Sequence, residues 1–147
     1  MKTARGPLVA IGIFAVSSLC GVTQSRAETV TDVLPGVWDW EAAPQRCQEN
    51  PHSIDFTPDR KSMEVRHPKG AVMGKETPRV VTVYRVLSES PSSLRMRIVG
   101  ESRRTDAGEP VVWDLVLLSR DSYCWHRTDW PPQGCTGRVL RCSAPSN

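Results

Sequence analysis

The chain has 147 residues, of which 39% are hydrophobic and 24% are charged, and its formal net charge is +3. This length leaves room for one domain. The small excess of basic residues excludes the concentrated positive surface that nucleic-acid binding requires, so we expect no nucleic-acid partner.

The first 27 residues have the pattern of a secretory signal peptide. A basic start precedes an apolar run from Leu8 to Val22, and the small-residue site Ser25-Arg26-Ala27 follows. The run is too short and too interrupted to cross a bilayer, so no membrane span is expected. Cys20 raises lipidation as an alternative, although Leu19 stands where a lipoprotein signal has a small residue. We predict cleavage after Ala27 and a periplasmic or secreted domain over residues 28–147.

Removal of this leader takes away Lys2, Arg5 and Arg26 and no acidic residue, which makes the mature chain neutral. It also leaves four cysteines in an oxidising compartment, where two disulfides are the expected outcome. Zinc is the alternative, with ligands from Cys124, His126, Cys135 and Cys142, although their spacing fits no standard zinc module. Met63, His67 and Met73 could similarly form a copper site, but such residues in a strand and a loop more often have packing and surface roles. We expect neither a metal nor a cofactor.

Short segments with a period of two, separated by turn residues, predict an all-β domain. The predicted strands span residues 36–42, 53–57, 62–66, 80–88, 94–100, 111–118, 123–129 and 139–142. Most connections are short enough for hairpins, and closure is the arrangement that removes exposed strand edges. We therefore predict an eight-stranded antiparallel up-and-down barrel, with a β-sandwich as the alternative.

The strand order gives a preference among the three possible disulfide connectivities. In an alternating meander, Cys47 after the first strand lies at the same rim as Cys135, which is between the last two strands. Cys124 and Cys142 would then lie at the opposite rim, and they are equidistant from a hairpin centred near Gln133. The predicted disulfides are Cys47 with Cys135 and Cys124 with Cys142.

The triplet Gly36-Val37-Trp38 opens the first predicted strand. With eight strand signals in an exported chain, it resembles the calycin-type barrels, which are the lipocalins, the avidins and small bacterial metalloprotease inhibitors. This resemblance implies that the indole of Trp38 closes the barrel base and that an arginine of the last strand, Arg138 or Arg141, packs over it.

Large aromatic side chains supply the candidate ligand site. The segment from Trp125 to Trp130 is the densest set of functional side chains, and strand alternation adds aromatic residues that face the interior. The candidate ligand-binding residues are Trp38, Trp40, Trp113, Trp125, His126, Arg127, Asp129 and Trp130. The same side chains alternatively just fill the barrel or form a hairpin held by cysteines.

These features favour a non-catalytic binding protein that holds a small apolar or amphipathic ligand in the barrel mouth. The alternative is a protein-interaction module such as a periplasmic protease inhibitor, which would engage its partner through an extended segment from Glu28 to Pro35 or a loop from Lys69 to Pro78. A hydrolase built on His126 with Asp114 or Asp129 lacks a nucleophile motif, so we expect no enzymatic activity.

Overall fold

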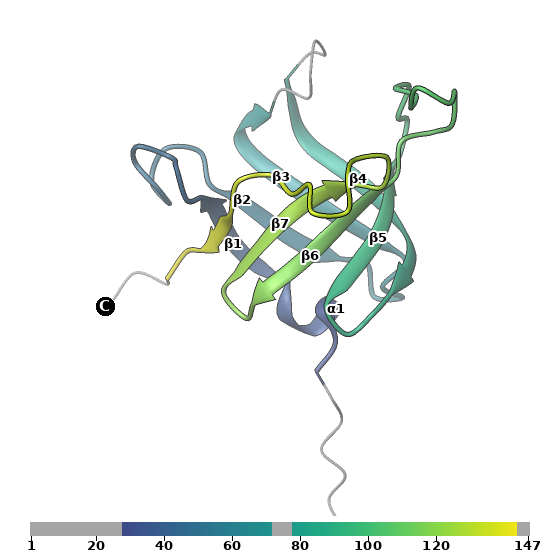
Figure 1. Cartoon of the computed structure of the whole chain (residues 1–147). Helices are drawn as coiled ribbons and strands as arrows, with labels where there is room; N and C mark the ends of the chain where they lie inside the picture. The colour runs from purple at the N-terminus through teal and green to yellow at the C-terminus, as the bar shows by residue number, and fades with distance from the viewer. Residues whose placement is uncertain (1–27, 72–77, 144–147) are drawn as a thin grey trace, which may run out of the picture.

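The computed structural model describes residues 28–71 and 78–143, and these form a closed barrel preceded by one short helix (Figure 1). Its elements are α1 (Val30–Val33), β1 (Gly36–Trp40), β2 (His52–Phe56), β3 (Ser62–Ala71), β4 (Arg79–Glu89), β5 (Ser93–Ile98), β6 (Trp113–Ser119), β7 (Ser122–Arg127) and β8 (Val139–Arg141). Within the described part of the chain, no helix is long and apolar enough to span a membrane.

The strands follow one another around the barrel in chain order, and every neighbouring pair is antiparallel. The ring closes where Trp38 of β1 pairs with Arg141 of β8 and Trp40 pairs with Val139. This closure confirms the predicted up-and-down barrel and rules out the sandwich. It also gives each strand two partners, so that its backbone groups present no free edge.

Alternation along the strands decides which side chains fill the interior. In β5, Leu94, Met96 and Ile98 are buried, whereas Arg95 and Arg97 between them are exposed. The same period places Leu115 of β6 and Tyr123 and Trp125 of β7 in the core, in agreement with the predicted faces. The interior is therefore built from large apolar and aromatic side chains, whose burial is the main stabilising contribution to such a fold.

The predicted strand boundaries differ from the observed ones in two informative places. Residues 30–33 form α1, where no helix was predicted, because a single turn is too short for helical periodicity to show. β3 continues to Ala71, so residues 69–71 of the loop that we predicted from Lys69 to Pro78 belong to a strand, and residues 72–77 lie outside the described residues. Its register with β4 shifts between Arg66 and Ala71, where Pro68 and Gly70 interrupt regular pairing.

One end of the barrel is closed by α1 and the chain that follows it. Val30 and Leu34 have no exposed surface and join the core, and the Leu34 carbonyl accepts a hydrogen bond from Trp38 Nε1 at 2.8 Å. The segment from Glu28 to Pro35 is thus packed onto the barrel. It does not form an extended arm, which was one of the two binding segments expected for the protein-interaction alternative.

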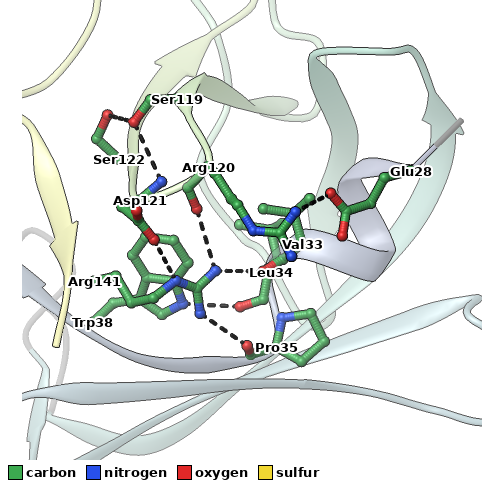
Figure 2. Close-up of polar contacts among 10 residues, drawn as sticks. All are labelled: Glu28, Val33, Leu34, Pro35, Trp38, Ser119, Arg120, Asp121, Ser122 and Arg141. Atoms are coloured by element: carbon green, nitrogen blue, oxygen red, sulfur yellow. Dashed lines mark hydrogen bonds and ion pairs between the residues drawn. The ribbon is translucent and has the colours of Figure 1, made fainter. Parts of the chain in front are cut away.

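Arg141 completes this closed end (Figure 2). Its guanidinium carbon lies 4.1 Å from the Trp38 ring centroid, which identifies Arg141 as the arginine over the indole. Figure 2 shows its nitrogens turned toward backbone carbonyls, and they donate to Val33, Pro35 and Arg120. Arg138, the other candidate, instead forms an ion pair with Glu41 at 2.7 Å.

Gly36 is required by this arrangement. Its φ is +139°, and a Cβ at this position would lie 2.7 Å from Arg141 Nη1. A larger residue would therefore be strained and would push away the guanidinium. Within this chain, Gly36 leaves room for Arg141, and Arg141 covers the ring of Trp38.

Two disulfides form, as predicted, but the predicted pairing is wrong. Cys47 is bonded to Cys142, and Cys124 is bonded to Cys135. After β1 the chain turns back along the outer wall, where the Cys47 amide donates to Asp39 Oδ2 at 2.7 Å. Cys142 lies on the same wall, since its amide donates to the Val37 carbonyl. Cys47 is therefore beside β1 rather than at the rim, and there it meets Cys142.

The register of β7 and β8 explains the second error. Tyr123 pairs with Val139 and Ser122 with Leu140, so a hairpin centred near Gln133 does not form and Cys124 does not face Cys142. Instead the connection folds onto β7, where Thr136 and Trp125 exchange two hydrogen bonds, from the Thr136 amide to the Trp125 carbonyl and from the Trp125 amide to Thr136 Oγ1. Cys135 is thereby placed next to Cys124.

Candidate functional site

A pocket of about 300 Å³ opens at the end of the barrel opposite α1. Its lining residues come from six strands and from the loops that follow β5 and β7, namely Trp40, His52, Val65, His67, Ala71, Thr82, Tyr84, Arg103, Trp113, Trp125 and Thr136. The volume corresponds to roughly ten water molecules at about 30 Å³ each. This pocket is at the lower limit of the usual range for small-molecule sites.

Three of the predicted tryptophans meet at this pocket. Trp40 lies at the rim with 38% of its surface exposed, and Trp113 and Trp125 are in edge-to-face contact with ring centroids 6.3 Å apart. Tyr84 stacks on Trp125 at 5.2 Å. Trp38 is fully buried at the closed end and does not line the pocket. The pocket wall is thus mainly aromatic, which favours flat apolar ligands.

The segment from Trp125 to Trp130 is divided between the two faces of the sheet. Trp125 points inward, but Arg127 and Asp129 form an ion pair with each other at 2.7 Å. Trp130 packs edge to face against Trp113, with ring centroids 5.8 Å apart, and does not itself line the pocket. Arg127 and Trp130 therefore pack against Trp113, and none of Arg127, Asp129 and Trp130 lines the pocket.

His126 lies on the outer face of β7, opposite Asp114 of β6. Its Nδ1 is 3.9 Å from Asp114 Oδ2, and both oxygens of that carboxylate accept hydrogen bonds from Arg95. The Nε2 atom of His126 lies 3.2 Å from the Pro131 carbonyl. These contacts make His126 part of a surface network outside the pocket.

Sequence analysis missed His52 and assigned His67 only to a possible copper site, although both line the pocket. Their rings stack with centroids 4.8 Å apart and an angle of 30° between planes. Strand alternation could have identified both residues. His52 is two positions from buried Ile54 on the same face of β2, and His67 is two positions from buried Val65 on the same face of β3. A histidine on the apolar face of a strand points into the barrel.

Burial keeps these imidazoles uncharged at neutral pH. Desolvation and, to a smaller extent, the nearby His67 lower the pKa of His52 to about 4, and Asp39 partly opposes both effects. Desolvation likewise lowers the pKa of His67 below its ordinary value, with Asp39 again opposing. At neutral pH the pocket therefore presents two neutral rings.

A hydrogen-bonded series runs from the pocket wall into the core. The indole of Trp125 hydrogen-bonds to the hydroxyl of Tyr123, and this hydroxyl is bonded to Nε2 of His52. Burial, followed by the proximity of Tyr84, raises the pKa of Tyr123 well above its ordinary value, so the hydroxyl keeps its proton. An indole N–H only donates, so the Tyr123 oxygen accepts from Trp125, and the tautomer of His52 decides which partner supplies the hydrogen between Tyr123 and His52.

Three buried polar atoms have no hydrogen-bond partner among the described residues, and all three belong to side chains that line this pocket. They are Nδ1 of His52, Nδ1 of His67 and Nε1 of Trp113. A buried polar atom without a partner costs free energy, on the order of 1–3 kcal/mol. Each has less than 1 Å² of accessible surface, so these nitrogens lie behind the surface that faces the open space of the pocket.

Arg103 and Glu101 form an ion pair at the pocket rim. Arg103 donates to both oxygens of Glu101, at 2.8 and 2.6 Å, and its guanidinium carbon is 5.7 Å from the Trp113 ring centroid. Burial would raise the pKa of Glu101, but the hydrogen bonds from Arg103 outweigh it and lower this pKa below its ordinary value. The two charges neutralise each other, so the rim adds no net charge from this pair.

The structure also bears on the metal alternatives. The cysteines of the zinc alternative are in disulfides, so their sulfurs are not thiolate ligands. Of the copper alternative, Met63 is fully buried in the core, His67 lines the pocket, and Met73 is outside the described residues. Among the described residues, three or more histidine, cysteine, aspartate or glutamate side chains nowhere gather closely enough to hold a metal ion.

Comparison with known proteins gives no significant match to a family model, to a curated protein or to a solved structure.

Proposed function

We propose that this protein binds a small apolar or amphipathic molecule in the pocket at the open end of the barrel. The observation that carries the proposal is the aromatic pocket of about 300 Å³ at the open end of the barrel, whose lining also includes the polar residues His67, Thr82 and Thr136. An aromatic wall supplies affinity through the burial of apolar surface, and a few polar groups orient the ligand.

The contrast with the closed end supports this function. The barrel base is filled by Trp38 and covered by Arg141 and α1, so a ligand has one route of entry. The likeness to the calycin-type barrels, in which a glycine and a tryptophan open the first strand, agrees with a ligand at the other end. Export follows from the same interpretation, because two disulfides suit an oxidising compartment and the leader pattern of residues 1–27 would direct the chain there.

A binding titration tests the proposal. We expect the uncharged dye Nile red to bind to residues 28–147 with both disulfides formed, with increased dye emission and quenching of tryptophan fluorescence. Thr82→Phe places a ring in the pocket and should abolish this binding, because Thr82 lines the pocket and is 3% exposed.

Val83→Phe is the matched control, since Val83 is the next residue of β4 and faces the other side of the sheet. It should leave Nile red affinity within about twofold of the wild type. The proposal fails if wild-type protein does not bind the dye, or if the two variants lose binding equally while both remain folded by circular dichroism.

A further inference from the structure

Two arginines without a counterion lie side by side on the outer wall of the barrel. Arg85 of β4 and Arg97 of β5 are directly opposite each other in the strand pairing, and both are exposed. Neither side chain forms a hydrogen bond or an ion pair with any residue that the structure describes. Like charges directly opposite each other on a sheet are destabilising, so this arginine pair does not serve the stability of the fold.

Acidic residues are present on both neighbouring strands, but other arginines already hold them. Glu64 of β3 forms an ion pair with Arg66 at 3.3 Å. Both oxygens of Asp114, on β6, accept hydrogen bonds from Arg95. The positive charge of the arginine pair is therefore not neutralised by the strands on either side of it.

The arginine pair borders an open hollow of about 240 Å³ on the same wall. Leu87 and Val99 also line this hollow, and they remain 46% and 53% exposed. The hollow is smaller than the usual site for a whole small molecule. It has room for one aliphatic side chain, which would cover the apolar surface of Leu87 and Val99.

The narrow width of this charged area favours a peptide over a membrane. A planar anionic membrane laid on this wall would also meet the carboxylates of Glu64 and Asp114, which flank the arginine pair and would repel it. A peptide can instead place one carboxylate at the two guanidinium groups, whose planar array of donors matches a carboxylate. An aliphatic side chain next to that carboxylate can then enter the hollow.

We propose that the outer wall of β4 and β5 docks an acidic segment of a partner protein. A carboxylate of this segment binds to Arg85 and Arg97, and a neighbouring aliphatic side chain packs between Leu87 and Val99. The site does not depend on the proposed ligand function, because alternation along β4 turns Tyr84 into the pocket and Arg85 to the outside.

Matched peptides test the chemistry of the partner. The probe is an acetylated and amidated hexapeptide in which glutamate and leucine alternate, and two variants replace every glutamate by glutamine or every leucine by serine. We expect the probe to bind at least about tenfold more tightly than either variant at about 50 mM salt, and to weaken as salt is added, because exposed charges are screened. Isothermal titration calorimetry measures the affinities.

A pair of double variants tests the site. Arg85→Gln with Arg97→Gln should weaken binding of the probe at least about tenfold. It should also unfold at a denaturant concentration no lower than the wild type, because it removes two opposed like charges. Arg46→Gln with Arg104→Gln is the control, since it changes the net charge equally at exposed arginines that do not line the hollow. It should leave the affinity within about twofold of the wild type.

Three results would overturn this docking site. They are equal affinities for the probe and its glutamine variant, equal losses of binding in the two double variants, and a lower denaturation midpoint after removal of the arginine pair. Sedimentation of the wild type with phosphatidylglycerol vesicles, without binding of the probe, would overturn it in favour of a membrane. Failure of Nile red to bind counts against the proposed pocket alone, because the dye and the peptide occupy opposite faces of the sheet.

Discussion

The two ends of the barrel differ in whether their buried side-chain nitrogens have hydrogen-bond partners. At the closed end, Trp38 Nε1 has the Leu34 carbonyl as its partner, and Arg141 bonds to three backbone carbonyls while covering the indole. At the open end, the indole of Trp113 and both histidines keep buried nitrogens without partners. Residues of similar chemistry are thus satisfied where they build the fold and unsatisfied where a ligand site is proposed.

The two disulfides constrain different parts of the barrel. Cys47–Cys142 ties the outer wall beside β1 to the chain after β8, and it closes a separation of 95 residues. Cys124–Cys135 spans only 11 residues and holds Thr136 and the β7–β8 connection at the pocket wall. The first therefore constrains the whole barrel, and the second constrains the local shape of the pocket.

The largest expected effect on the free energy of unfolding comes from removing each of the two disulfides in turn. Replacing Cys47 and Cys142 together by serine should lower the free energy of unfolding by about 4 to 5 kcal/mol, whereas the same change at Cys124 and Cys135 should cost about 3 kcal/mol, since the stabilisation grows with loop length. Denaturant unfolding of both variants measures the difference. An equal loss in the two variants would contradict the assignment of a global and a local role.

The same substitution at Trp38 and at Trp113 compares the indoles of the two ends directly. Trp38→Phe should lower the free energy of unfolding by about 2–4 kcal/mol, because it leaves the Leu34 carbonyl unpaired, opens space and weakens the contact with Arg141. Trp113→Phe should cost about 1 kcal/mol or less, since removing an unpartnered buried N–H offsets part of the lost packing.

Urea denaturation at pH 7.5 measures both changes. If Trp113→Phe proves as damaging as Trp38→Phe, the indole N–H of Trp113 has a partner in solution, and the contrast between the two ends disappears.

Acidification should lower the free energy of unfolding, because burial of His52 in the fold opposes its protonation. Its pKa is about 4 in the folded protein and ordinarily 6.5, so the unfolded chain binds the proton more readily between these values. Stability is complete above pH 6.5 and decreases as the pH falls toward 4, by about 2 kcal/mol from pH 7 to pH 5. The lowered pKa of His67 acts in the same direction. Unfolding free energies measured at half-unit intervals of pH give the slope.

His52→Gln should remove a large part of this slope, and His126→Asn, on the outer face of β7, is the control. A stability that is constant between pH 7 and pH 5 in the wild type would show that His52 is not held neutral by burial.

The sequence predicted the candidate site only in part. Trp40, Trp113 and Trp125 are where alternation placed them, because a period of two assigns each strand residue to one face. The same rule, applied to His52 and His67, would have put both rings in the pocket. The prediction relied instead on the segment after Trp125, where functional side chains are dense along the chain but divided between the two faces of the sheet.

The amino-acid sequence by itself determined the strands, their inward faces and the closed barrel, because these depend on local alternation and on short connections between neighbours. Only the tertiary structure decided the disulfide pairing, the packing of α1 at the base and the meeting of His52, His67 and Trp113 around one pocket. The physical reason is that these features depend on where connections such as the one carrying Cys47 fold back across the barrel. That path is set by long-range hydrogen bonds such as the one from Cys47 to Asp39, which leave no periodic trace in the chain.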